Sequence, residues 1–185
     1  MENIIRGKVW KHGKVDTADI ISTKIWLENL NNLDPDILGK HAMAPIDKEF
    51  ASRAMRGDFR IIVSGKNFGG GGKSFEHGVI ALKAVGIVLV VAESFARYNF
   101  RNSINNGLPV LECNGIFNAV EAGDEIEADL STGVIKNLTS GAALQADPLP
   151  EFVLGIMEAG SYTAYIREQL RQTGTNKANC AGETL

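Results

Sequence analysis

Two runs of aliphatic and β-branched residues stand out along the chain, at 59–64 and at 87–91. Runs of this length and composition predict buried strands. A glycine-rich stretch follows the first run, and apolar residues then recur at helical spacing from Glu76 until Gly86. A strand, a loop, a helix and a second strand in this order are typical of a parallel crossover.

Shorter patterns predict the remaining elements. Alternation over 4–10 predicts an N-terminal strand, and turn residues between 125–130 and 134–138 predict a hairpin. Helices are predicted where capping residues precede apolar spacing, at 33–40, 47–56, 94–104, 151–159 and 163–171, and a further short strand is predicted at 110–113. We therefore expect one α/β domain over residues 1–170, followed by a flexible C-terminal tail over residues 171–185.

Charge and cysteine content narrow the function classes. The chain has 19 Lys and Arg residues against 22 Asp and Glu residues, without a basic stripe, which argues against a nucleic-acid partner. The longest apolar stretch, 84–92, is too short to cross a membrane, and no signal-peptide pattern precedes it. Cys113 and Cys180 are expected to be free thiols in a reducing cytoplasm, because two cysteines cannot complete a four-thiolate metal site.

Glycine is the one residue type in excess, at 20 of 185 residues, or about 11% against a typical ~7%. Four glycines form the cluster Gly69-Gly70-Gly71-Gly72. Clustered glycines between a strand and a helix allow close approach to a ligand, and the N–H groups at the helix start favour an anion. A tight turn with several positive φ angles explains the cluster equally well. A nucleotide P-loop fits only at Gly72-Lys73-Ser74, because Asn67 occupies the position of its first glycine.

Several blocks of sequence stand in a characteristic order. They are Gly7-Lys8-Val9-Trp10, Asp16-Thr17, Gly65-Lys66-Asn67-Phe68-Gly69, Glu76-His77, Ser94-Phe95-Ala96-Arg97 and Gly107-Leu108-Pro109. Together, over about residues 4–170, they resemble the small subunits of 3-isopropylmalate dehydratase and, more broadly, the swivel domain of the aconitase superfamily. The resemblance implies a single compact swivelling β/β/α domain with a glycine-rich active-site loop.

The resemblance also implies an activity and a partner. Members of this superfamily move a hydroxyl between adjacent carbons of a hydroxy-dicarboxylic acid by dehydration and rehydration, and the best-matching substrate is 3-isopropylmalate, in leucine biosynthesis. A 4Fe-4S cluster on a separate large subunit acts as the Lewis acid, so this chain would bind no cofactor and would be inactive alone. Two alternatives stay open. One is a catabolic dehydratase of a substituted malate such as dimethylmalate, and the other is a non-catalytic module that binds an anion or nucleotide through the glycine loop.

The end of the loop departs from the family pattern. The resemblance implies a loop ending in Ser-Ser-Arg before Glu-His, where the first serine is the base and the arginine clamps a substrate carboxylate. Here these positions hold Lys73-Ser74-Phe75, so the arginine is absent. We expect Ser74 to be the base and Lys73 to replace the positive charge, although lysine lacks the fork of arginine. Otherwise the substrate differs at that end, or the chain has lost activity and kept the fold.

The resemblance implies further site residues on both sides of the loop. A second segment is expected to cover the variable substituent of the substrate, although ordinary packing explains its apolar residues nearly as well. The expected substrate-binding residues are Gly70, Gly71, Gly72, Lys24, Ile25 and Trp26.

Other polar residues have simpler explanations. His77 is expected to support the site, but a histidine in a first helical turn also often serves only as a hydrogen-bonding group. Asp16 and Asp19 fit helix capping better than a paired acid and base. Arg97 and Arg101 lie on one predicted helix face, where solvated or ion-paired arginines are the common case.

Overall fold

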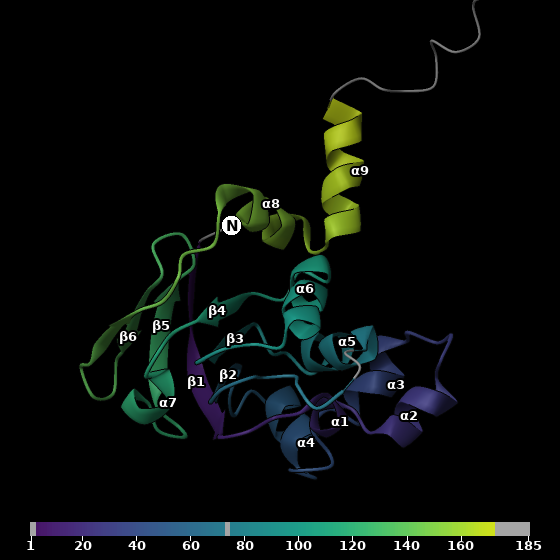
Figure 1. The fold of residues 1–185 in the computed structure, drawn as a ribbon, viewed down its shortest axis with the longest axis horizontal. Coiled ribbons are helices and arrows are strands. Elements are labelled where there is room, and N and C mark those ends of the chain that lie inside the picture. The colour runs from purple at the N-terminus through teal and green to yellow at the C-terminus, as the bar shows by residue number, and fades with distance from the viewer. Residues whose placement is uncertain (1–2, 73–74, 173–185) are drawn as a thin grey trace, which may run out of the picture.

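A mixed seven-stranded sheet of order β4-β3-β2-β1-β5-β6-β7 forms the centre of the chain (Figure 1). The computed structural model describes residues 3–72 and 75–172. The strands are β1 (Ile4–His12), β2 (Ile61–Ser64), β3 (Leu89–Ala92), β4 (Val110–Glu112), β5 (Glu125–Asp129), β6 (Val134–Asn137) and β7 (Ala143–Gln145). The first four strands run parallel, and β5 to β7 are antiparallel.

The long first strand joins the two halves of the sheet. Its residues 4–8 pair antiparallel with β5, whereas its residues 9–12 pair parallel with β2. One strand therefore passes from one half-sheet to the other, which curls the sheet and leaves the carboxyl ends of β1, β2 and β3 at a common edge. The loops that follow these three strands meet at that edge.

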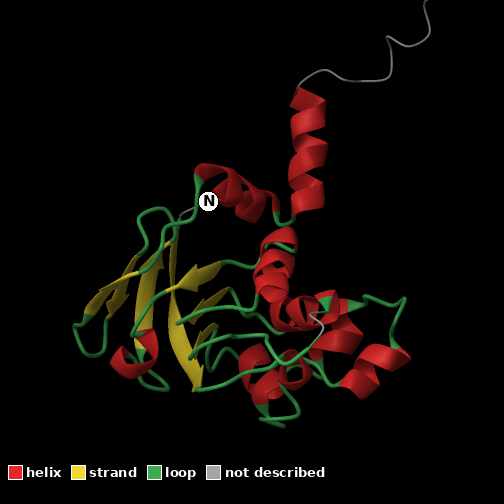
Figure 2. Ribbon diagram, in the orientation of Figure 1, coloured by secondary structure: helices red, strands yellow, loops and turns green. Residues whose placement is uncertain are grey.

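The helices lie mainly on one side of the parallel half (Figure 2). They are α1 (Thr17–Ile20), α2 (Thr23–Glu28), α3 (Pro35–Gly39), α4 (Phe50–Met55), α5 (Glu76–Ala84), α6 (Arg97–Asn105), α7 (Ile116–Ala119), α8 (Glu151–Ala159) and α9 (Tyr162–Gln172). In Figure 1, α1 to α6 gather beside the parallel strands and α9 projects from the body, whereas α7 contacts β2 and β3.

Both faces of the parallel half are buried. Along β2, Ile62 packs into the hydrophobic cluster under the helices, while Ile61 and Val63 pack into a second cluster that includes residues of β5 and β6. Along β3, Val90 and Val91 divide between the same two clusters. Alternate residues of a strand point to opposite faces, so burial of both faces produces a continuous apolar run. This explains why the hydrophobic pattern predicts these two strands correctly.

The predicted crossover is confirmed, since β2 and β3 pair in parallel and α5 lies between them in the chain. Sequence patterns did not predict α2, α7 and β7. The α2 helix has six residues, none of them buried, so it produces no apolar stripe in the sequence. It is stabilised locally instead, because the Ser22 side chain accepts a hydrogen bond from the N–H of Ile25.

The C-terminal end of the described chain is helical. The α9 helix ends at Gln172, two residues past the predicted domain boundary. The rest of the predicted tail, including Cys180, lies outside the described residues, so the division at residue 170 stays a prediction. None of the helices in the described ranges has the length and apolar character needed to span a membrane.

The thiol of Cys113 is buried directly after β4. Burial raises its pKa from the ordinary value of 9.0, and the negative charges of Asp147 and Glu93 raise it further. A pKa that is higher in the folded state stabilises the fold fully below the unfolded value, and this contribution is lost as the pH rises through the folded value.

We therefore expect the free energy of unfolding to fall between about pH 8 and about pH 10, and to fall less in a Cys113→Ala variant. Urea unfolding at both pH values measures this, and a Cys180→Ser background removes the other thiol. Equal losses in the two proteins would contradict the assignment.

Candidate functional site

The loop between β2 and α5 is hydrogen-bonded on one side to the segment that follows β1. The Gly69 N–H donates to the Val15 carbonyl at 2.8 Å. Thr17 contributes twice, because its N–H donates to the Gly70 carbonyl at 2.8 Å and its hydroxyl donates to the Gly69 carbonyl at 2.7 Å. The buried Thr17 side chain thus anchors the first half of the glycine cluster.

On its other side the same loop contacts the segment that follows β3. The Phe68 N–H donates to the Ser94 carbonyl at 2.9 Å, and the Ala96 N–H donates to the Phe68 carbonyl at 3.0 Å. The rings of Phe68 and Phe95 pack edge to face, with centroids 5.7 Å apart. The loop is therefore fixed between two neighbouring loops as far as Gly70.

Two glycines of the cluster are required by the backbone and by their surroundings. Gly69 has φ of +72°, and a Cβ there would lie 2.3 Å from Cγ of Asn99. Gly71 has φ of +77°, and a Cβ there would lie 2.6 Å from Cγ of Asp16. Residues other than glycine rarely adopt such φ angles. The tight-turn explanation of the cluster therefore holds at both positions, whatever ligand the loop meets.

The three glycines expected to bind an anion differ in their N–H groups. Gly70 is buried, and its N–H donates to the Asn67 carbonyl at 3.1 Å. Gly71 and Gly72 are exposed, and neither N–H has a partner within the described ranges 3–72 and 75–172. The donors that a ligand can reach are thus those of Gly71 and Gly72.

Three buried side-chain atoms around the loop lack a hydrogen-bond partner in the described part of the chain. They are Oδ1 of Asp16, Oδ1 of Asn99 and Nδ1 of His77. Asp16 packs against Gly71 and Asn99 packs against Gly69, while His77 lies in the first turn of α5. Such a group costs about 1–3 kcal/mol when left unpaired, and unpaired groups in native proteins often mark a functional site.

Asp16 and Asn99 contact the glycine cluster from other parts of the chain. Asp16 is the N-cap of α1, as expected, and its Oδ2 lies 3.1 Å from Nζ of Lys14. Asn99, on α6, was not among the predicted site residues. Its contact with Gly69 joins residues 30 positions apart, so no local sequence signal could have identified it.

His77 connects the start of α5 to α2. Its Nε2 lies 2.9 Å from the carbonyl oxygen of Asn29, the C-cap residue of α2. Because a carbonyl oxygen only accepts, Nε2 must carry the proton, and Nδ1 of the neutral ring is left as an acceptor. His77 therefore serves as a hydrogen-bonding group, as the simpler explanation predicted. Its Nδ1 remains able to accept a further hydrogen bond.

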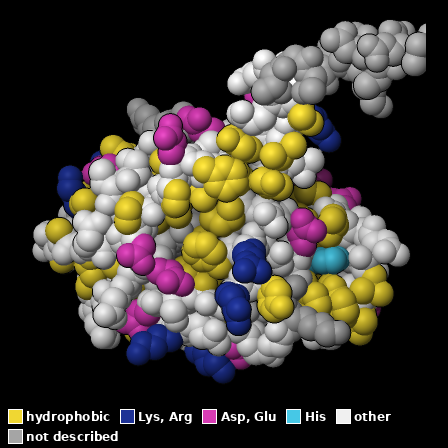
Figure 3. Space-filling model, turned by 45° about the horizontal axis from the view of Figure 1, so that its top comes forward, with side chains coloured by type: hydrophobic (Ala, Val, Ile, Leu, Met, Phe, Trp, Pro, Cys, Tyr) yellow, Lys and Arg dark blue, Asp and Glu magenta, His cyan; other side chains and the backbone are white. Residues whose placement is uncertain are grey.

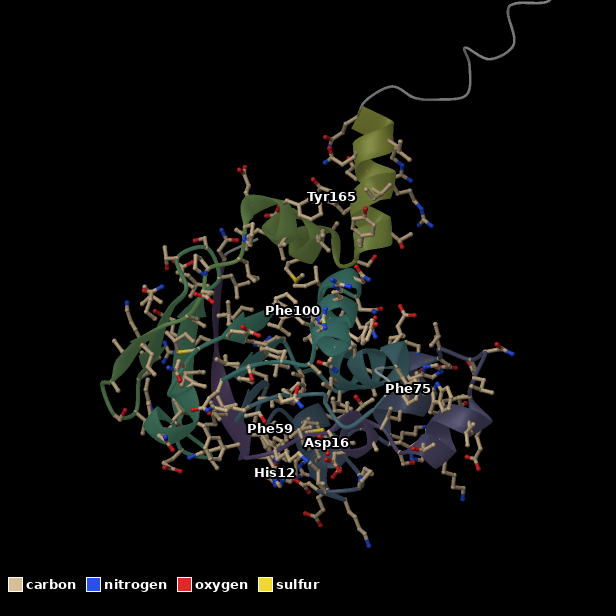
Figure 4. All side chains as sticks on the ribbon, in the orientation of Figure 1. His12, Asp16, Phe59, Phe75, Phe100 and Tyr165 are labelled. Carbon is tan, nitrogen blue, oxygen red and sulfur yellow. The ribbon has the colours of Figure 1, made fainter. Side chains whose placement is uncertain are left out.

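The loop end and the predicted specificity segment are in contact. The rings of Trp26 and Phe75 stack at a centroid distance of 4.0 Å and an interplanar angle of 16°. Ile25 is partly buried against the core. Lys24 is exposed, and its Nζ lies 3.9 Å from Oε1 of Glu28. Figure 4 shows Phe75 beside α2 and α5. Packing thus accounts for Ile25, while Trp26 extends from α2 to the residue that ends the loop.

Lys73 and Ser74, the expected catalytic residues, lie outside the described residues. Their roles stay predictions, although Gly72 and Phe75 on either side are described. Among residues 3–72 and 75–172, no three His, Cys, Asp or Glu side chains are grouped to hold a metal ion.

Residues 17–115 match the family model of the aconitase C-terminal domain. The chain is 45% identical over 170 residues to the 3-isopropylmalate dehydratase small subunit of Caldicellulosiruptor bescii, covering 91% of this chain and 98% of that one. It is 45% identical over 174 residues to the isopropylmalate/citramalate isomerase small subunit of Methanocaldococcus jannaschii, covering 94% and 99%. The chain belongs to the family of 3-isopropylmalate dehydratase small subunits.

A solved structure agrees with this membership. The crystal structure of 3-isopropylmalate dehydratase from Methanocaldococcus jannaschii superposes with a TM-score of 0.80 at 35% identity, covering 94% of this chain and 99% of that chain. The predicted α/β swivel-domain class is therefore confirmed. The family match contains the whole glycine loop together with α1, α2, α5 and α6, the helices that surround it.

Proposed function

We propose that this chain is the small subunit of a hydro-lyase that acts on a small hydroxy-dicarboxylic acid, with 3-isopropylmalate, of leucine biosynthesis, as its substrate. The activity requires a large subunit, on which the family places a 4Fe-4S cluster. The proposal rests on the glycine loop. In a chain of this family, the loop presents the two free N–H groups of Gly71 and Gly72 beside buried, unpaired polar atoms of Asp16, Asn99 and His77.

In this mechanism the loop binds and deprotonates the substrate. The N–H groups of Gly71 and Gly72 donate to a substrate carboxylate, and Lys73 adds a positive charge. The oxygen of Ser74 takes the proton from one carbon while the hydroxyl leaves the adjacent carbon as hydroxide, so that the two together amount to one water. Rehydration returns the proton and hydroxyl at exchanged positions. The cluster of the large subunit supplies Lewis-acid chemistry to the hydroxyl.

His77 has a supporting role in the proposal. Its bond to the Asn29 carbonyl fixes the start of α5 against α2. The specificity segment 24–26 and the loop end are thereby held together, and Lys24, Ile25 and Trp26 cover the substituent of the substrate. The free thiol of Cys113 is compatible with a reducing cytoplasm, which we propose as the location.

Reconstitution tests this function directly. The full chain is co-expressed with the large subunit encoded in the same genome, purified without oxygen and supplied with 3-isopropylmalate, and isomerisation is followed by NMR. We expect turnover only when both subunits are present. A complex that forms but never converts 3-isopropylmalate would contradict the named substrate, and failure to form any complex would contradict the subunit assignment.

A second substrate class is favoured by one contact. The stack of Trp26 on Phe75 places aromatic surface where the family's loop has an arginine, so the enzyme could instead dehydrate a substituted malate such as dimethylmalate. The same reconstituted complex is therefore supplied with 2,3-dimethylmalate. A higher kcat/KM for dimethylmalate than for 3-isopropylmalate would select the catabolic dehydratase.

Trp26→Ala should change substrate preference, because it removes apolar surface that faces the substituent. We expect kcat/KM for 3-isopropylmalate to fall about tenfold or more relative to that for a malate with a smaller substituent. Leu27→Ala, at an exposed neighbour on α2, is the matched control and should leave the ratio unchanged. Equal losses for both substrates would remove Trp26 from the specificity site.

A further inference from the structure

A cavity of about 310 Å³ lies between α6, the end of β4 and the segment that leads into α8. Its volume is at the lower end of the range typical of small-ligand sites. Figure 4 shows Phe100, one of its lining residues, well apart from Phe75 and Asp16 at the glycine loop. The cavity borders the glycine loop through Phe95, which packs on Phe68, but none of the proposed site residues lines it.

One wall of the cavity is basic. Arg97 and Arg101 lie four residues apart, which places them on the same side of α6, and both line the cavity. In the described part of the chain neither guanidinium has an ion-pair partner. Both side chains are exposed, so of the two expected alternatives the solvated one is observed in the described chain. Two adjacent guanidinium groups suit a carboxylate, which they can bind through paired hydrogen bonds.

A second part of the cavity wall is acidic. Glu112, at the end of β4, and Asp147, before α8, both line the cavity. The Asp147 N–H donates to the Glu112 carbonyl at 3.1 Å, which holds the two residues together, and Oε1 of Glu112 accepts from the Phe95 N–H at 3.2 Å. The negative charge of Asp147 also raises the pKa of buried Cys113. This wall therefore carries negative charge that the arginines do not neutralise.

The basic and the acidic residues line one cavity without pairing, since no ion pair within 4.0 Å joins them in the described chain. Apolar side chains of Phe95, Phe100 and Leu149 also line the cavity. The face drawn in Figure 3 carries apolar areas with basic and acidic side chains near them. Opposite charges that border an apolar hollow match a ligand with both charges and an apolar body.

We propose that this cavity binds an α-amino acid with an aliphatic side chain. The carboxylate binds the basic wall of Arg97 and Arg101, and the ammonium group binds the acidic wall of Glu112 and Asp147. The aliphatic side chain packs against the aromatic rings. The site goes beyond the proposed hydro-lyase function, and its test needs neither the large subunit nor turnover.

Calorimetric titration of the full chain tests the proposal with L-leucine and two probes that each lack one charge. The probe 4-methylpentanoate lacks the ammonium group, and 3-methylbutylamine lacks the carboxylate. We expect saturable binding of L-leucine, and at least tenfold weaker binding of both probes. Saturable binding of 4-methylpentanoate as tight as that of L-leucine would overturn the proposal, and so would the absence of saturable L-leucine binding.

Charge-removing variants assign the two walls. Arg101→Gln should weaken L-leucine at least tenfold and leave the amine probe unchanged, whereas Asp147→Asn should weaken L-leucine and leave the acid probe unchanged. Arg167→Gln on α9 and Asp36→Asn on α3, both at exposed positions, are the matched controls and should bind as the parent does. L-leucine binding that neither wall variant weakens would refute the assignment. If L-leucine does not bind but Arg101→Gln weakens assembly with the large subunit, the cavity belongs to the subunit interface and the proposal fails.

Discussion

Ser74→Ala should lower kcat of the reconstituted enzyme about 10²–10⁴-fold with little change in KM, because a positioned general base contributes on this scale to proton abstraction. Ser74 is the one serine that remains where the family's loop has two, and the neighbouring Gly71 and Gly72 carry the free N–H groups of the loop. Loss of the base would impair the chemical step and leave the carboxylate contacts in place.

The comparison needs the assembled complex and a matched serine. Ser140→Ala, at an exposed serine in the turn between β6 and β7, should retain the parental kcat. Co-purification of the large subunit with each variant separates loss of chemistry from loss of assembly. Turnover of Ser74→Ala near the parental value would exclude Ser74 as the base and would direct attention to Lys73.

Gly69→Ala should destabilise the fold by about 3 kcal/mol. A left-handed φ costs an L-residue roughly 1–2 kcal/mol, and overpacking of a buried site typically adds 1–3 kcal/mol. Both apply here, because φ is +72° and the new Cβ would lie 2.3 Å from Cγ of Asn99. In a chain of this length, about 3 kcal/mol corresponds to a fall in Tm of roughly 6–12 °C.

The control for this substitution is Gly57→Ala. Gly57 has φ of +83°, but a Cβ there would have nothing within 4 Å. It therefore isolates the backbone cost, and we expect a loss of about 1–2 kcal/mol. Urea unfolding of both variants measures the difference. A Gly69→Ala variant no less stable than Gly57→Ala would show that the contact of the loop with Asn99 is loose.

The elements that sequence patterns predicted correctly are those specified by many neighbouring residues. The apolar runs that became β2 and β3 are continuous because both faces of the sheet are buried. The start of α3 was also predictable from the sequence, because Asp34 accepts from the N–H of Asp36 and Pro35 lies in the first turn. The α2 helix has a capping serine, Ser22, but no buried residue and so no apolar stripe, and it was not predicted.

The candidate site likewise has a part that the sequence identified and a part that only the tertiary structure decided. Order and spacing of short blocks along the sequence identified the family and the glycine loop. Tertiary structure alone decided that Asn99 lies against Gly69 and that Trp26 stacks on Phe75. It also decided that the arginines of α6 line one cavity together with Glu112 and Asp147. The physical reason is range. Hydrophobic periodicity and capping act between residues close in sequence, whereas Asn99 is 30 positions from Gly69 and Trp26 is 49 positions from Phe75. Whether such residues meet depends on how the whole sheet curls.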